Sequence, residues 1–322
     1  MFSRRDLGRM AAAALPIASA VRVFGAGKVD SKFNGVQIGV QTYSFRDLPD
    51  PAHQDIPAMV QIGLGEAELM SEHAETLVGA PAQPGFPGGG RRGQMSAEER
   101  EARQAAQAAR AAELSKWRAS ISMDKFKDVR KQFDDAGIIL ALLCYNMNEK
   151  TTDDEIEYGF QLAKTLGVQA ISTSTQVSMA KRIAPFADKH KMMVGFHGHD
   201  NTTNANEVSS PETFATVMSA SKYHGVNLDI GHFTAANFDA IAYIKEHHAR
   251  ITNVHIKDRK KDHGPNMPFG EGETPIKEAL RLVSKEKYPF PANIEFEYKV
   301  PEGSDVKSEV AKCLKYCKDA LA

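Results

Sequence analysis

Cysteine is scarce in this chain, with three residues among 322. So small and odd a number excludes a framework of disulfide bonds, even for a protein that leaves the cytoplasm. Cys313 and Cys317 are one helical turn apart near the end of the sequence, and Cys144 lies in an apolar run. We therefore interpret all three as buried packing groups rather than metal ligands or nucleophiles.

An excess of charge of either sign is also missing. Lysine and arginine together number 40 and aspartate and glutamate 41, which leaves a formal net charge of -1. This balance provides no electrostatic attraction to nucleic acid or to an anionic membrane, so we expect neither as a partner. The content of 42% hydrophobic and 25% charged residues is typical of a soluble globular protein that buries a large core.

The apolar run near the N-terminus, residues 10–21, is too short to span a bilayer. It follows Arg4 and Arg5, is rich in alanine and ends in small residues, a pattern typical of an export signal. The adjacent arginines indicate the twin-arginine route. We expect residues 1–26 to be this signal, with cleavage near 20–26; the alternative is a short amphipathic helix. The signal predicts a periplasmic or otherwise exported protein with no membrane span after its removal.

Short apolar runs alternate with amphipathic helical patterns along the rest of the chain. Helical patterns of the expected length include 154–166 and 235–246. The strand candidates are 36–42, 67–70 (the weakest), 138–144, 170–173, 192–197, 225–229, 251–256 and 292–297. Alternating strands and helices indicate a parallel sheet, and eight such units predict an α/β fold, a single (β/α)8 TIM barrel over residues 33–322. A doubly wound sheet is disfavoured because no glycine-rich phosphate loop follows the first strand.

One segment breaks this alternation. Residues 79–93 are rich in glycine and proline, and residues 96–114 are rich in alanine, glutamate and arginine, which favour a helix. We interpret about 76–116 as an insertion after the second strand, on the side of the barrel where active sites lie. A solvated loop and helix is favoured over a lid or a partner contact.

Polar residues gather where the last four predicted strands end. His197, Asp229 and His255 each close a strand, and the final strand contains Glu295 and Glu297. In a parallel barrel these ends meet at one face, where catalytic groups are found. Strand alternation places the two glutamates on the same side. Each residue alone has a structural explanation: a hydrogen-bonded histidine, a helix cap, a surface charge. Their joint occurrence at consecutive strand ends points to a site.

Two imidazoles and carboxylates that converge in this way form a mixed nitrogen and oxygen ligand set. Such a set suits one divalent ion, Mn²⁺, Zn²⁺, Co²⁺, Mg²⁺ or Fe²⁺. The ligands would be His197, Asp229, His255 and one of the two glutamates. A bound ion can act as a Lewis acid on a carbonyl group and stabilise the enediolate formed when a neighbouring proton leaves.

Three further motifs carry a family resemblance. Their sequences are D-x-x-H at 229–232, V-H-I-K-D at 254–258 and G-E-G at 270–272. The chain resembles the sugar phosphate isomerase/epimerase family, the xylose isomerase-like barrels, which also include inosose dehydratases, ketose 3-epimerases and endonuclease IV. The likeness covers nearly the whole chain after the signal. With its H-x-H-D form at 197–200, the chain is similar to a large exported branch of the family.

The resemblance implies metal ligands of the order Glu, Asp, His, Glu. Three of them carry over onto Asp229, His255 and Glu295, the last being preferred because it is the first acidic residue of the final strand motif. His197 stands where ketose epimerases have a glutamate that doubles as an acid and base. The general base here would therefore be drawn from the remaining polar residues of these motifs, which are Glu297, His232, His199 and Lys257.

The leading functional hypothesis is abstraction of a proton α to a metal-bound carbonyl of a sugar. The outcome would be isomerisation, epimerisation or β-elimination, and exported relatives look suited to 3-keto glycosides. Export also argues against phosphorylated sugars. One alternative, a DNA repair enzyme like endonuclease IV, is disfavoured by the export signal and the balanced charge. A second alternative is a sugar-binding barrel without activity, and assembly into a homo-oligomer is left open.

The twin-arginine signal makes a direct prediction. Replacing Arg4 and Arg5 together by lysine should leave the precursor inside the cell, because the route reads the arginine pair itself. Cell fractionation and N-terminal sequencing of the expressed protein would measure this. Finding the unaltered protein wholly in the cytosol, with residues 1–20 intact, would contradict the expectation.

Overall fold

The structure, a computed structural model, describes residues 29–82 and 96–322. The predicted export signal, residues 1–26, lies outside this range, as does most of the stretch rich in glycine and proline. None of the helices in the described part of the chain is both long and apolar enough to cross a membrane.

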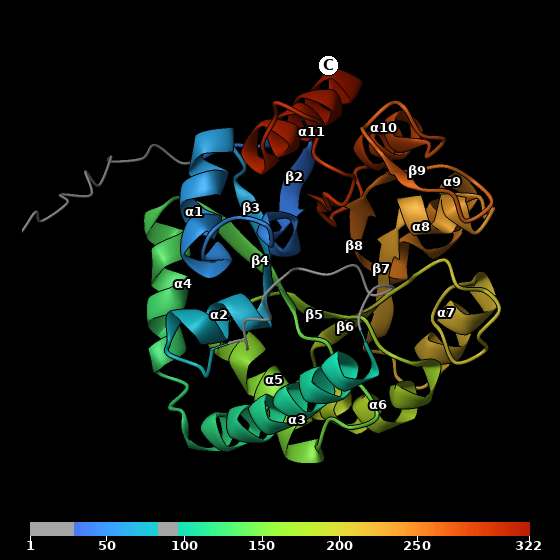
Figure 1. Cartoon of the computed structure of the whole chain (residues 1–322). Helices are drawn as coiled ribbons and strands as arrows, with labels where there is room; N and C mark the ends of the chain where they lie inside the picture. The colour runs from blue at the N-terminus through green and yellow to red at the C-terminus, as the bar shows by residue number, and fades with distance from the viewer. Residues whose placement is uncertain (1–28, 83–95) are drawn as a thin grey trace, which may run out of the picture.

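Eight parallel strands close into a barrel at the centre of the molecule (Figure 1). β2 pairs with β11 on one side and with β3 on the other, which completes the ring. In chain order these strands are β2 (Val36–Gln41), β3 (Glu66–Met70), β4 (Ile139–Cys144), β5 (Ala170–Thr173), β6 (Met193–His197), β7 (His224–Asp229), β8 (Ile251–Ile256) and β11 (Ala292–Ile294). The predicted α/β barrel is thereby confirmed.

Helices surround the barrel on all sides (Figure 1). They are α1 (Pro51–Ile62), α2 (Ser71–Leu77), α3 (Ala97–Ser120), α4 (Lys125–Asp135), α5 (Asp153–Leu166), α6 (Ala180–His190), α7 (Pro211–Ser219), α8 (Ile230–Ala235), α9 (Ala240–His247), α10 (Ile276–Glu286) and α11 (Val306–Leu321). The main apolar core joins outward residues of the strands, such as Val226 and Leu228, to buried residues of the helices, such as Ile183 and Leu280. Burying this shell supplies the main driving force for folding.

The inside of the barrel, in contrast, is lined by polar side chains. Asn253 on β8 donates to Glu68 on β3 at 2.9 Å, although two strands of the sheet lie between β3 and β8, so the bond crosses the interior. Asn293 donates to Glu66 at 2.6 Å in the same way. The absence of a side chain at Gly39 leaves space for the Glu66 carboxylate, since a Cβ atom at residue 39 would lie 1.5 Å from one of its oxygens. These hydrogen bonds lie beside a small apolar cluster of Leu142, Ala170 and Met193, so the interior is only partly apolar.

Two predicted elements differ in the structure. The helix expected over 235–246 begins only at Ala240, as α9, because Asn237 has a left-handed φ of 65° and Asp239 caps the helix by accepting from two backbone amides. The short helix α8 precedes it and ends at Ala235. The last strand ends at Ile294 rather than at residue 297. The amide of Phe296 instead donates to the hydroxyl of Ser44 at 3.0 Å, which takes the chain out of the strand ladder.

Two short antiparallel pairs complete the sheets. β1 (Lys32–Phe33) pairs with β2, and β9 (Asp258–Arg259) pairs with β10 (Asn266–Met267).

The helix α3 lies in the segment interpreted as an insertion. Ser96 begins it with a capping box that includes Glu99, and it continues beyond the predicted end at 114. Its last turns hold it to the barrel: Arg118 forms an ion pair with the buried Glu75 of α2 at 2.7 Å and lies 3.6 Å from Glu155 of α5. Most residues of the helix before Leu114 are exposed. The C-terminal end of α3 is therefore its anchor.

This anchor predicts a large effect of one substitution. Arg118→Ala should lower the free energy of unfolding by about 3 kcal/mol, because the Glu75 carboxylate would stay buried without its partner. Urea unfolding followed by circular dichroism measures the difference. Lys131→Ala is the control, since it removes an exposed partner of Asp135 and should leave stability almost unchanged. If both variants lost the same free energy of unfolding, Arg118 would not be the anchor of α3.

Candidate metal centre

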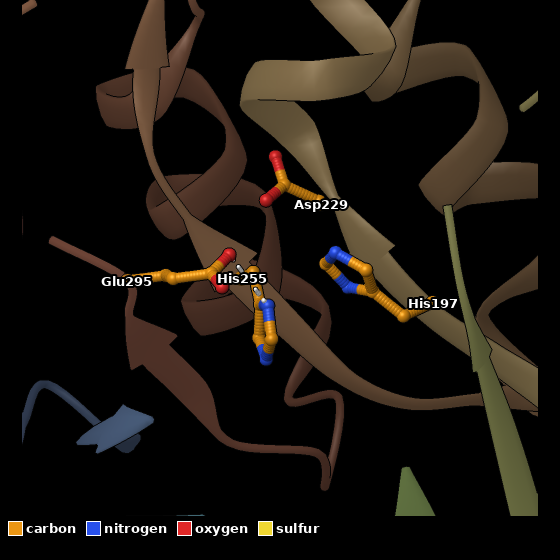
Figure 2. A group of neighbouring side chains, drawn as sticks. All are labelled: His197, Asp229, His255 and Glu295. Carbon is orange, nitrogen blue, oxygen red and sulfur yellow. Dashed lines mark hydrogen bonds and ion pairs between the residues drawn. The ribbon is translucent and has the colours of Figure 1, made fainter. Parts of the chain in front are cut away.

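Four side chains meet above the centre of the barrel, and they are the four predicted ligands. His197, Asp229, His255 and Glu295 are all buried, and one potential ligand atom from each lies within 4.8 Å of the other three. Figure 2 shows them pointing toward one another from neighbouring segments. His197 and Asp229 end β6 and β7, while His255 is the penultimate residue of β8. Glu295 directly follows β11.

Asp229 serves two purposes through its two carboxylate oxygens. Oδ1 accepts a hydrogen bond from the backbone amide of His232 at 2.7 Å and so caps α8. Asp229 is therefore a helix cap, as its structural explanation proposed, and its second oxygen has a separate position. Oδ2 accepts no hydrogen bond from the described residues, although the ammonium group of Lys257 lies 3.1 Å away. The cap thus fixes the carboxylate and leaves one oxygen directed at the cluster.

The two histidines of the cluster differ in their surroundings. Burial, together with the neighbouring His255, holds the pKa of His197 well below its usual range, and its Nδ1 has no hydrogen-bond partner among the described residues. Burial also disfavours a charge on His255, but the carboxylates of Glu68 and Glu295 outweigh it and raise the pKa of His255 well above its usual range. His197 is therefore neutral, with a ring nitrogen free to bind a ligand.

Lys257 is the positive centre of the site. Its Nζ lies 2.8 Å from Glu295 and 2.7 Å from Glu297, in addition to its contact with Asp229. Burial opposes a charge on this lysine, yet the three carboxylates raise its pKa above the ordinary value. In turn, although burial works in the opposite sense, Lys257 and His255 hold the pKa of Glu295 well below its usual range. Charged carboxylates are therefore available at the cluster.

The residues present fit a divalent ion. Two imidazoles and two carboxylates form a ligand set of borderline hardness that suits Zn²⁺, Mn²⁺, Co²⁺ or Fe²⁺. A buried ring nitrogen of His197 has no hydrogen-bond partner in the described part of the chain, which is unusual for a folded protein unless a ligand binds there. The Oδ2 atom of Asp229 has the ammonium group of Lys257 at 3.1 Å as its neighbour. The geometry thus allows a metal centre, and the role of the four residues as its ligands stays a prediction.

A cavity of about 370 Å³ opens above the cluster and gives a small molecule access to it. One wall carries charged groups and imidazoles. The opposite wall is formed by side chains from the ends of β2 to β5, which are uncharged apart from the deeply buried Glu68, namely Gln41, Glu68, Met70, Cys144, Asn146, Ser172 and Ser174. Tyr43, 37% exposed, lies at the same cavity. Burial raises the pKa of Cys144, so this thiol remains protonated and the expectation that it is not a nucleophile is consistent with its surroundings.

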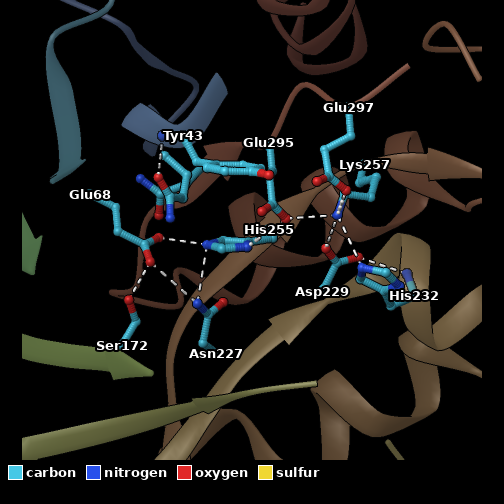
Figure 3. Close-up of polar contacts among 12 residues, drawn as sticks. Tyr43, Glu68, Ser172, Asn227, Asp229, His232, His255, Lys257, Glu295 and Glu297 are labelled. Carbon is cyan, nitrogen blue, oxygen red and sulfur yellow. Dashed lines mark hydrogen bonds and ion pairs between the residues drawn. The ribbon is translucent and has the colours of Figure 1, made fainter. Parts of the chain in front are cut away.

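The other predicted catalytic residues also face this cavity. Glu297, His232, Lys257 and His199 all line it. His199 Nδ1 lies 2.7 Å from Glu207, and His232 Nδ1 lies 3.2 Å from Asp200. His232 Nε2 lies 3.1 Å from Nζ of Lys257 (Figure 3). Burial and the charge of Lys257 lower the pKa of His232. Imidazole and carboxylate pairs of this kind can transfer protons.

Two of the sequence motifs have structural explanations as well. Asp258, in V-H-I-K-D, accepts the backbone amides of Gly270, Gly272 and Thr274 at 2.7–3.2 Å and so holds the G-E-G loop. In D-x-x-H, a Cβ atom at Gly231 would lie 2.8 Å from the carbonyl oxygen of Lys257. The close packing of α8 on β8 therefore requires glycine at this position.

The sequence analysis assigned no role to three carboxylates of this region, although Asp200 is the last residue of the H-x-H-D form. Glu68 lies beneath His255, with its Oε2 2.6 Å from Nε2 of that ring. Asp200 contacts His232, Arg259 and His263, and Glu207 contacts His199. Asp200 directly follows the H-x-H pair, which was a usable signal. Glu68 belongs to the weakest predicted strand, and Glu207 lies in a loop with no motif.

Comparison with known proteins agrees with the observed fold. The sequence profile of the xylose isomerase-like TIM barrel matches residues 100–317, more than half of the chain. The chain belongs to this family. No curated protein sequence matches it.

Solved structures of the family share the barrel at low sequence identity. A sugar phosphate isomerase/epimerase from Parabacteroides distasonis is 16% identical with a TM-score of 0.55, over 88% of this chain and 93% of that one. The probable 3-DHS dehydratase AsbF of Bacillus anthracis is 14% identical with a TM-score of 0.59, over 87% and 97%. The IolI protein, solved with a zinc atom, is 13% identical with a TM-score of 0.61, over 88% and 98%. At these identities the likeness shows the fold alone.

The ligand set predicts the outcome of one histidine substitution. His255→Ala should abolish stoichiometric binding of a divalent ion without unfolding the barrel, because the residue lies at a strand end above the packed shell. Elemental analysis of the purified protein measures this. The control is His190→Ala, which removes another mostly buried imidazole, paired with Glu157, away from the cluster. Equal metal content in His255→Ala and in the unaltered protein would exclude His255 as a ligand.

Proposed function

We propose that this protein is a divalent-metal-dependent enzyme that removes a proton α to the carbonyl group of an uncharged sugar or 3-keto sugar. The observation that carries the proposal is the meeting of His197, Asp229, His255 and Glu295 at the floor of a cavity that also contains a carboxylate, Glu297, outside that set. When bound, the ion would polarise the carbonyl group and so acidify the neighbouring C–H bond. The residues around it then supply the base and the acid.

Glu297 is the best placed base. It lines the cavity and is not among the four candidate ligands. Lys257, whose Nζ lies 2.7 Å from its Oε2, holds the carboxylate in place. A carboxylate that is fixed and partly open to the cavity can accept a proton from a bound substrate. Because Lys257 also contacts Glu295, it sets the position of this base relative to the ligand set.

An acid is available on another side of the cavity. His199, after β6, lines the cavity and is oriented by Glu207, whereas Glu297 follows β11. The β8 and β7 strands lie between β11 and β6 in the sheet, so the two groups approach a substrate from different directions. A bound sugar between them could lose a proton to Glu297 and receive one from His199. Return of the proton to a different carbon or face gives an isomer or epimer.

The charge of the cavity supports an uncharged substrate. Among the described residues that line it, Lys257 is the one lysine or arginine, and its ammonium group is already in contact with three carboxylates. A phosphate or carboxylate group on the substrate would therefore meet no free cation, whereas the amides and hydroxyls of Gln41, Asn146 and Ser174 suit sugar hydroxyl groups. This agrees with the proposed export, since phosphorylated sugars are mainly cytosolic.

β-Elimination of a 3-keto glycoside is a second candidate reaction. The observation that favours it is His197, an imidazole of lowered pKa at the position where the epimerase pattern has a carboxylate. Such a site has one carboxylate base, Glu297, rather than a pair on opposite faces. In elimination, Glu297 takes the proton from carbon, the C–H electrons form the double bond, the glycosidic C–O bond breaks, and His199 donates a proton to the leaving oxygen. One base and one acid suffice for this sequence.

Two other functions fit less well. A repair nuclease like endonuclease IV would use several metal ions, and the described residues contain a single candidate cluster and no compensating excess of positive charge. A sugar-binding barrel without activity would not need Glu297 and the His199–Glu207 pair beside the cluster. Proton abstraction therefore remains the better proposal.

The proposal predicts different effects for the two glutamates of the last strand motif. Glu297→Gln should keep the metal and the fold but lower turnover by about 10²–10⁴-fold, because the base is lost. Glu295→Gln should lose the metal as well. Turnover of a panel of ketoses and 3-keto glycosides in D₂O, followed by mass spectrometry of substrate and product, measures both.

Glu302→Gln serves as a control because it removes an exposed glutamate five residues further along the chain. It should retain activity and metal. If products form without deuterium at any carbon and no elimination product appears, proton abstraction is wrong, and metal-assisted hydrolysis or a hydride shift becomes the better account.

A further inference from the structure

Glu68 is a fully buried carboxylate directly beneath the candidate metal centre. It lies on β3, on the far side of the barrel from His255, and its side chain has no exposed surface. A buried carboxylate that is not compensated destabilises a folded protein strongly, so its partners define what it does. Those partners are not surface cations but polar groups that converge on it from the interior.

Four donors surround the Glu68 carboxylate. Ser172 and Asn227 donate to Oε1, the second at 3.4 Å, and Asn253 donates to Oε2 at 2.9 Å. His255 Nε2 lies 2.6 Å from the same Oε2 (Figure 3). These groups come from β5, β7 and β8, so the carboxylate is held from several strands at once. It offers His255 a fixed acceptor.

This contact determines which nitrogen of His255 faces the cluster. A neutral imidazole carries one N–H group and one lone pair. Nε2 lies 2.6 Å from Glu68 Oε2 and 3.1 Å from Nδ2 of Asn227, and the shorter contact assigns the Nε2 proton to Glu68. A metal ion would then take the place of the proton on Nδ1, the atom that lies 3.1 Å from Glu295. Metal-binding histidines commonly donate their second N–H to a carboxylate, which fixes the ring and increases its basicity as a ligand.

We infer that Glu68 is a positioning residue for the metal centre: it holds the Nε2–H group of His255 so that Nδ1 is presented to the divalent ion. The inference rests on the proposed function, since it requires an ion at the cluster. Glu68 itself is not a ligand, because it lies on the opposite edge of the His255 ring from Glu295. Its effect reaches the ion through His255.

Glu66 provides a matched comparison on the same strand and the same face. It is also buried, but it bonds to Asn293 and contacts no member of the cluster. Burial and the proximity of Glu68 raise the pKa of Glu66 well above its usual range. Removing the carboxyl group of Glu66 therefore disturbs a buried polar group of the barrel interior without releasing His255. Glu66→Gln is the natural control for Glu68→Gln.

The test is the affinity of the full chain for Zn²⁺ and Mn²⁺, measured by competition with a chromophoric chelator. Glu68→Gln should bind each ion about 10–100-fold more weakly than the unaltered protein. Glu68→Leu, which removes the acceptor altogether, should bind more weakly still, and Glu66→Gln should bind as the unaltered protein does. Thermal unfolding of each metal-free variant reports whether it is folded. A purely structural role would lower the unfolding temperature and leave the affinity unchanged.

A second measurement needs no substitution at Glu68. In the Zn²⁺-loaded protein, long-range ¹H–¹⁵N spectra of the histidine rings should show His255 protonated on Nε2, with its signal assigned by loss in His255→Gln. A proton on Nδ1 instead, or unchanged affinity in both Glu68 variants, would overturn the positioning role while leaving the metal centre intact. If the unaltered protein binds neither ion, the proposed function fails and this inference fails with it.

Discussion

The ammonium group of Lys257 is the interaction on which the site depends. Three carboxylates, those of Asp229, Glu295 and Glu297, lie within 3.1 Å of it in a region almost closed to solvent. Burying charges costs several kcal/mol per ion, so such a group of acids requires a buried cation. Close packing against Gly231 fixes the stem of the lysine. A metal ion at the cluster would share two of these carboxylates, those of Asp229 and Glu295, with Lys257, so the lysine would affect how tightly the site holds the ion.

The alternation of side chains along the strands makes this arrangement compatible with a stable barrel. On β7, Val226 and Leu228 point outward into the apolar shell, while Asn227 and Asp229 point inward. Stability therefore comes mainly from the strand and helix interface outside the barrel. The interior is free to be polar, provided that its groups are satisfied. Hydrogen bonds that cross it, such as Asn253 to Glu68, fix the height and rotation of the residues at the strand ends.

Much of the fold and the four clustered residues could be predicted because each depends on local patterns. An apolar run that ends in histidine or aspartate predicts a buried strand and places its last side chain at the strand end, as for His197 and Asp229. Glu68 could not be found in this way, since its five-residue strand contains two acids and its partners are 104–187 residues away. The end of β11 at Ile294 was missed for the same reason: the hydroxyl of Ser44, 252 residues earlier, terminates the ladder. Contacts between distant segments leave no periodic trace in the sequence.

His197 stands where the resembling ketose epimerases have a glutamate, and this difference affects the electrostatics of the site. In the epimerase pattern a carboxylate at this position would add a negative charge to those of Asp229, Glu295 and Glu297. Burial lowers the pKa of His197, so in the proposed metal centre it would supply a ligand atom without adding a negative charge. The candidate proton-transfer groups are then unequal: a carboxylate, Glu297, beside Lys257 and an imidazole, His199, oriented by Glu207. A base and an acid of different strength favour a reaction in which one proton leaves carbon and another is delivered to oxygen. Within the proposed function, this asymmetry would therefore favour isomerisation or elimination over a symmetric epimerisation.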